Sequence, residues 1–275
     1  MAKRIGLIGV PLEDLYVEGQ TMLVSTYIPH ITNGLRKAVV EETNKRSISV
    51  RDIGEVFLGE DYDRPYPTDR YDEVPDRFIR DMRWRDMRLL ERARDKALTL
   101  SRYYDLLVAV GHSHLGAIVL YDNLESVARL DYHSDYTKCS YRSLMVNFAC
   151  YMNWVEQNIL LSEVTNYFTN CLKDGKPMDV FDRRAGSIDD KSYRHAKHID
   201  IDVDCVDWEY HIQDSYRQDE RLGGPTGVSP DDVVRMVGEA RPNKLGIWEY
   251  RLNHDRSGGL GVKMIADCIE AAVKR

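Results

Sequence analysis

Residues 199–207 read Ile199-Asp200-Ile201-Asp202-Val203-Asp204-Cys205-Val206-Asp207, so acids alternate with mostly β-branched residues. Successive side chains of a strand point to opposite faces, which puts Asp200, Asp202 and Asp204 on one face, about 7 Å apart between neighbours. Carboxylates grouped in this way repel one another, so we expect a cation among them. A solvated edge strand with an acidic face would show the same alternation and is the alternative.

Two further apolar runs end in ionisable side chains. Residues 106–110 are followed by Gly111-His112-Ser113-His114, and the run 127–135 ends with Asp131, His133 and Asp135 at alternate positions. A single histidine is more often hydrogen-bonded locally than a ligand, but open parallel sheets place their ligands beyond the carboxyl ends of the strands. Oxygen and nitrogen donors without sulfur favour a divalent ion such as manganese, and carboxylates shared among six candidate ligands favour two ions.

Short β-branched runs alternate with amphipathic stretches along the chain. This pattern predicts an α/β fold, in which helices cover both faces of a mainly parallel central sheet. Besides the acidic segment, we expect strands at 3–11, 47–57, 106–110, 127–135, 160–164, 178–181 and 245–250. Helices are expected at 33–45, 77–103, 141–157, 230–240 and 260–273, with a polar loop at 59–76. Ser229 is a typical N-cap because Pro230 and two acids follow it.

Length, composition and charge limit the class of protein. The 275 residues, 43% of them hydrophobic, are enough for the core of one large domain, and we expect a single catalytic domain over residues 1–275. A net charge of −7 argues against a nucleic-acid partner and favours a cationic small substrate. The absence of a signal-peptide segment and of any long apolar run predicts a soluble, cytoplasmic protein without a membrane partner. Five cysteines without a CxxC pair indicate reduced thiols.

The three motifs resemble those of the ureohydrolases, the family of arginase and agmatinase, whose two manganese ions lie at the strand ends of a three-layer αβα sandwich. Residues 111–115 are similar to the family's Gly-Gly-Asp-His-Ser motif, with His114 as the ligand and His112 as an additional histidine. Residues 131–135 are similar to Asp-Ala-His-x-Asp. Residues 200–208 are similar to Ser-x-Asp-x-Asp-x-x-Asp-Pro, with Asp200 in place of serine and Trp208 in place of proline.

The resemblance implies a hydrolase with two Mn²⁺ ions and assigns its site residues. One ion would be bound by His114, Asp131, Asp135 and Asp202, and the other by Asp131, His133, Asp202 and Asp204. Glu249 would hold the substrate guanidinium, and Asp135 would also pass a proton to the leaving nitrogen. Water shared by two divalent cations loses a proton near neutral pH, and the resulting hydroxide can attack the guanidinium carbon to release an amine and urea.

The differences from the family concern the substrate. Arginases that act on free arginine carry a Ser-Gly-Asn run and a His-Gly pair after the second motif, where residues 136–147 of this chain have neither. The contacts to the α-amino and α-carboxylate groups are therefore not expected. The chain is most similar to the peptide arginases, which convert arginine to ornithine in ribosomally made peptides. This resemblance implies an arginine-containing precursor peptide as partner, and homo-oligomers are common in the family.

Three alternatives to a peptide arginase follow from the same residues. The nearest is a hydrolase of a small guanidino compound such as agmatine or a guanidino acid. Another is a non-catalytic, metal-bound relative that binds guanidine, because the family's loop histidine is missing. A relative of the deacetylases, which bind one zinc ion in the same sandwich, is least favoured because His133 and Asp204 would then have no second ion to bind.

Overall fold

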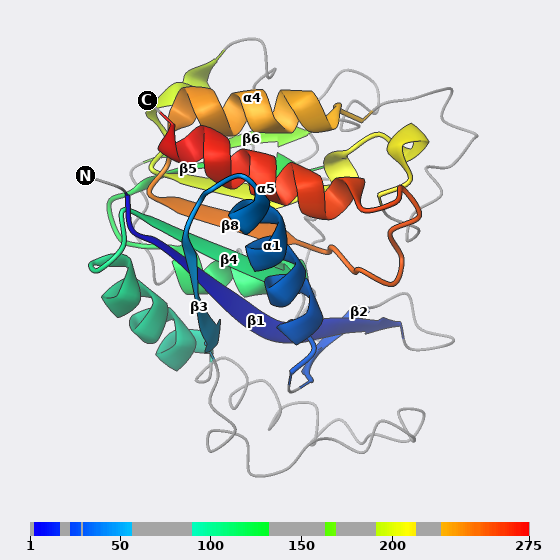
Figure 1. Ribbon diagram of the computed structural model, residues 1–275. Helices are drawn as coiled ribbons and strands as arrows, with labels where there is room; N and C mark the ends of the chain where they lie inside the picture. The colour runs from blue at the N-terminus through cyan, green and yellow to red at the C-terminus, as the bar shows by residue number, and fades with distance from the viewer. Residues whose placement is uncertain are drawn as a thin grey trace, which may run out of the picture.

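The computed structural model describes residues 3–16, 23–28, 30–56, 90–131, 163–168, 191–212 and 227–274. Its centre is an eight-stranded sheet in the order β2-β1-β4-β8-β7-β5-β6, with β3 beside β1 (Figure 1). The strands are β1 (Ile5–Tyr16), β2 (Leu23–Tyr27), β3 (Val50–Glu55), β4 (Leu106–His112), β5 (Ser126–Asp131), β6 (Glu163–Phe168), β7 (His198–Asp202) and β8 (Lys244–Trp248). All pairs are parallel except β1 with β2.

Helices pack on both faces of this sheet. Along β4, Val108 and Val110 pack in one core with α1 (Asn33–Lys45), α4 (Pro230–Ala240) and α5 (Leu260–Val273). Leu107 and Ala109 belong to a second core with the helix at 90–101 and the 3₁₀ helix η3 (His114–Leu120). Because neighbouring strand residues point to opposite faces, these cores lie on opposite sides of the sheet. The predicted three-layer αβα sandwich is therefore confirmed.

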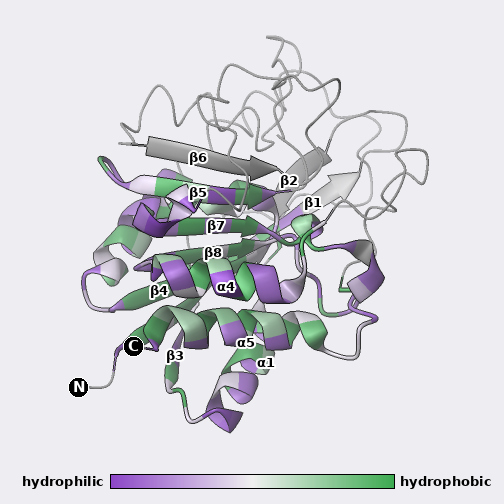
Figure 2. Ribbon diagram, turned by 90° about the horizontal axis from the view of Figure 1, so that it is seen from above, coloured by the Kyte–Doolittle hydropathy of each residue, from purple (hydrophilic) through white to green (hydrophobic). Residues whose placement is uncertain are grey.

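The helices that face the first core begin and end where the sequence predicts. In α4 the Ser229 hydroxyl accepts a hydrogen bond from the Asp232 backbone N–H at 3.1 Å, and Pro230 occupies the first helical position. Figure 2 shows hydrophilic and hydrophobic residues alternating along α4 and α5, as expected for helices with one buried face. The predicted ranges 33–45, 230–240 and 260–273 are all confirmed.

The acidic segment differs from its predicted form in two ways. It is not a solvated edge strand, because β7 pairs with β5 and β8 and all its residues are buried. The expectation of three aspartates on one strand face is also wrong, because β7 ends at Asp202 and Asp204 lies in the 3₁₀ helix η6 (Val203–Cys205). The Asp202 side chain caps this turn by accepting a hydrogen bond from the Asp204 N–H at 3.2 Å.

Other strands also begin or end at residues that differ from the prediction. The first strand continues to Tyr16 and pairs with β2, which was not predicted, and β6 begins and ends later than the predicted 160–164. The expected loop at 59–76, the helix at 141–157, the strand at 178–181 and the first part of the helix at 77–103 lie outside the described residues. Cys205 and Cys268 are buried free thiols, as expected. None of the described helices combines the length and the apolar character needed to cross a bilayer.

Candidate metal centre

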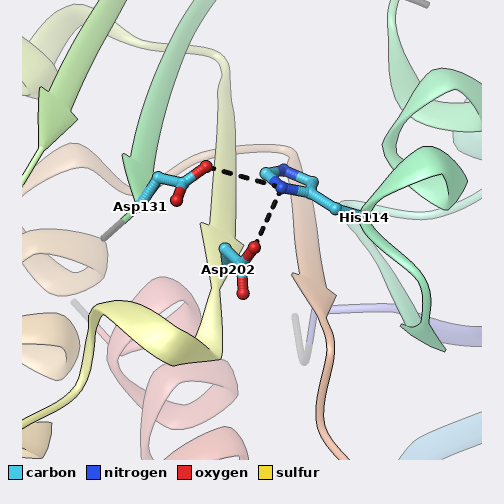
Figure 3. Close-up of side chains that lie close together, drawn as sticks. All are labelled: His114, Asp131 and Asp202. Carbon is cyan, nitrogen blue, oxygen red and sulfur yellow. Dashed lines mark ion pairs between the residues drawn. The ribbon is translucent and has the colours of Figure 1, made fainter. Parts of the chain in front are cut away.

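The ends of three strands bring His114, Asp131 and Asp202 together (Figure 3). Asp131 is the last residue of β5 and Asp202 the last residue of β7, while His114 begins η3 shortly after β4 ends. The Nδ1 atom of His114 lies 3.1 Å from Asp202 Oδ2 and 3.5 Å from Asp131 Oδ2. All three side chains are buried. The parallel strands thus place one imidazole nitrogen against two carboxylates at the carboxyl edge of the sheet.

A second group shares Asp202 with the first. Ligand atoms of Asp202, Asp204 and Glu249 lie within 4.8 Å of one another. Glu249 follows β8 directly and has a φ of 59°, in the left-handed region that non-glycine residues seldom adopt. Such a conformation costs on the order of 1–3 kcal/mol, so the surrounding structure must hold it in place. The chain direction at the end of β8 is therefore part of what brings Glu249 to the acids of β7 and η6.

These residues fit a divalent cation. Buried carboxylates within a few ångströms of one another repel unless a positive charge lies among them. The donors in both groups are oxygen and imidazole nitrogen, which suit manganese and similar ions. The buried thiol of Cys205, which neighbours Asp204 in the chain, belongs to neither group. Figure 3 shows that the side chains of Asp131 and Asp202 come from the ends of two strands and that of His114 from a separate segment, so all three point toward one position.

The structure brings together most of the predicted site residues. His114, Asp131, Asp202, Asp204 and Glu249 all lie in the two groups. The remaining predicted ligands, His133 and Asp135, lie outside the described residues.

His112 belongs to neither ligand group and has a different environment. Its Nδ1 atom lies 2.8 Å from Glu13 Oε2, and Arg251 donates to the other oxygen of the same carboxylate. Burial raises the pKa of Glu13, but the hydrogen bond from His112 and the charge of Arg251 together outweigh burial and lower it. This cluster joins β1 and the end of β4 to the segment after β8.

Two charged residues beside the ligands were not among the six predicted ligands. Asp200 Oδ2 lies 3.2 Å from His114 Nε2, on the side of the ring away from the two ligand carboxylates. Arg129, fully enclosed on β5, donates to Asp131 Oδ2. In both cases the sequence signal was a charge placed two residues before a ligand, within an otherwise apolar strand.

We compared the whole chain with known proteins. No family model matches the sequence, and no curated protein matches it. Among solved structures, arginase from Medicago truncatula matches with a TM-score of 0.65 and 14% identity, over 99% of this chain and 86% of that chain. Arginase from Bacillus cereus matches with a TM-score of 0.62 and 14% identity, over 99% of each chain. Proclavaminate amidino hydrolase from Streptomyces clavuligerus matches with a TM-score of 0.59 and 16% identity, over 99% of this chain and 91% of that chain. The fold of this chain is therefore that of the arginase-like ureohydrolases.

Proposed function

We propose that this protein is a metal-dependent hydrolase of guanidino groups. The observation that carries the proposal is the pair of ligand groups that share Asp202, at the carboxyl edge of an arginase-like sheet. The donor atoms suit Mn²⁺, and a carboxylate common to both groups suits two ions. Divalent ions bound there would supply the Lewis acidity that makes water nucleophilic near neutral pH.

The chain's own residues have distinct roles in this proposal. Glu249 balances the positive charge of the guanidinium and accepts hydrogen bonds from its planar nitrogens. Asp202 holds both ligand groups in one geometry, and Asp131 and His114 complete the buried side of the centre. Water adds to the guanidinium carbon, the bond from that carbon to the substituted nitrogen breaks, and this nitrogen takes a proton. We assign that proton transfer to Asp135, on the basis of the motif alone.

We further propose that the guanidino group belongs to arginine within a peptide, which becomes ornithine during the maturation of a ribosomal peptide. The support comes from the sequence of residues 136–147, which lacks the groups that bind a free amino acid in arginases. A site built on such polar groups rejects ligands that leave them unpaired, and without them that selection is lost. Small guanidino compounds are the second candidate substrates. The support for them is that the solved structures with the same fold are named as arginases and an amidino hydrolase.

The test compares matched substrates with manganese-loaded protein. Urea is measured from an end-blocked peptide with an internal arginine, from agmatine and from free arginine, and the peptide is examined by mass spectrometry for the loss of cyanamide mass from arginine. A peptide with lysine in place of arginine and a chelator-treated sample are the controls. We expect manganese-dependent urea and the highest kcat/KM for the peptide. A preference for agmatine or free arginine would contradict the peptide assignment only, and no urea from any guanidino substrate would contradict the hydrolase itself.

A further inference from the structure

We infer that Asp200 is a positioning residue, which holds the His114 ring so that Nδ1 faces the ligand carboxylates and strengthens His114 as a metal ligand. This inference rests on the proposed metal centre. Asp200 Oδ2 lies 3.2 Å from Nε2, while Nδ1 lies 3.1 Å from Asp202 Oδ2. A carboxylate only accepts hydrogen bonds, so the Asp200 contact requires a hydrogen on Nε2, and in the neutral tautomer that this contact favours Nδ1 carries the lone pair that an ion would bind. Such a partner on the second nitrogen fixes the tautomer and makes the imidazole more basic.

Asp200 is itself held on both oxygens. The Tyr121 hydroxyl donates to Oδ2 at 3.0 Å, and the Trp248 indole N–H donates to Oδ1. Both aromatic side chains are fully buried. With donors on each oxygen, the carboxylate cannot turn toward the centre and act as a further ligand. Asp200 therefore acts on the His114 ring and does not bind the ion itself.

Three glycines leave the space that the Trp248 indole needs beside this carboxylate. Gly246 is the residue opposite Asp200 on β8, and a Cβ there would lie 2.6 Å from Trp248 Nε1. A Cβ at Gly116 would lie 2.6 Å from the far edge of the same indole, and one at Gly111 would lie 3.2 Å from it. Glycines from β4, η3 and β8 thus leave the space in which the indole lies. Any larger residue at Gly246 or Gly116 would displace the donor to Asp200.

A buried carboxylate in the middle of a sheet also needs a positive charge nearby. Arg129 is the residue opposite Asp200 on β5, so both side chains project from the same face of the sheet. Its guanidinium donates to Asp131, which belongs to the ligand group. A cation therefore shares a face of the sheet with the carboxylate that contacts Nε2, which favours the form of that carboxylate that accepts from His114.

The experiment measures manganese affinity by the electron paramagnetic resonance of free Mn²⁺, for the wild type and for Asp200→Asn. Loss of an outer partner of a histidine ligand typically weakens metal binding about 10- to 100-fold, and we expect a loss in that range, with kcat restored at high manganese concentration. Trp248→Phe keeps an aromatic ring but removes one donor, so we expect a smaller loss in the same direction. Glu125→Gln is the matched control, because it removes the half-buried carboxylate that pairs with the buried Lys244 at the amino end of β8. It should leave the affinity unchanged.

A purely structural role for Asp200 would lower the unfolding free energy of the metal-free protein and leave the affinity of the folded fraction unchanged. Wild-type affinity in Asp200→Asn would therefore overturn the inference while leaving the proposed hydrolase intact. If the wild type itself bound no manganese, the metal centre would be wrong and the inference with it. The two failures are distinguishable because the second is visible before any variant is measured.

Discussion

At the scale of single residues, the position of Glu249 fits two different roles. Its carboxylate lies near Asp202 and Asp204, so it has the position of a third ligand as well as that of a partner for a guanidinium. We expect Glu249→Gln to keep full manganese content but to lower kcat/KM by at least about 100-fold, because a neutral amide no longer balances the substrate's charge.

The two measurements for this variant are metal analysis after gel filtration and the urea assay. Asp207→Asn is the control, because Asp207 is a nearby acid that belongs to neither ligand group. A loss of one manganese ion in Glu249→Gln would instead show that Glu249 is a ligand. Wild-type turnover would show that it has neither role.

Most members of the two groups stand out in the sequence by residue type and spacing, although the assignment of each residue to an ion came from the resemblance to the ureohydrolases. Asp131 and Asp202 end apolar strands, and their side chains had to meet once the strands were parallel neighbours. The roles of Asp200 and Arg129 could not be predicted in this way. They depend on which strand lies beside which, and on an indole from β8 that reaches back over Gly246. Tertiary contacts of this kind leave no periodic signal in the sequence.

At the scale of elements, α4 offers a clean test of local stability. The Ser229 hydroxyl accepts from the Asp232 N–H and donates to the Asp232 carboxylate at 2.7 Å, so the first turn depends on one side chain. We expect Ser229→Ala to lower the free energy of unfolding by about 1 kcal/mol, the usual cost of losing an N-cap. Urea denaturation measures this loss.

The control for the cap is Ser229→Asn, which keeps a capping oxygen and should retain most of the stability. Manganese affinity should be the same in both variants, because α4 packs on the face of the sheet opposite the ligand carboxylates. Equal stabilities for the alanine and asparagine variants would show that the hydroxyl does not determine the start of the helix.

The ranges of helices with strong local sequence signals were predicted correctly. The ends of strands that depend on contacts with other parts of the chain were not. The ranges of α1, α4 and α5 follow from apolar periodicity, with a strong N-terminal signal only at α4. The continuation of β1 through Leu12 and Glu13 was missed because its pairing with β2 is antiparallel and falls in a polar stretch. The end of β7 was missed because the side chain of Asp202 turns the chain into η6, and alternation alone does not show this.

At the scale of the whole molecule, Glu13 links segments that are far apart in the sequence. It accepts from His112 at the end of β4 and from Arg251 after β8, and these contacts lower its pKa below the ordinary 4.5. A carboxyl group with a lowered folded pKa stabilises the protein above its unfolded value and loses that contribution as pH falls through the folded value. We therefore expect Glu13→Gln to destabilise the metal-free protein at pH 7.

The same variant should differ less from the wild type as the pH falls below about 4.5, because the wild-type carboxyl is then protonated on unfolding and finally in the folded state. Urea denaturation of chelator-treated protein at several pH values between about 3 and 7 measures this difference. A difference that stays constant over that range would show that the charge of Glu13 is not what stabilises the contact.

The stability of the whole molecule should also depend on manganese, because the candidate ligands come from separate strands that are brought together only by folding. A ligand that binds only the folded state stabilises it by about 2.7 kcal/mol at a free concentration 100 times its Kd. We expect this gain for the wild type and its disappearance on addition of chelator. Asp202→Asn should lose most of the gain because Asp202 belongs to both ligand groups, whereas Asp207→Asn should keep it. An equal manganese response in the two variants would mean that the ion binds elsewhere, and that the shared carboxylate at the end of β7 is not the centre of the site.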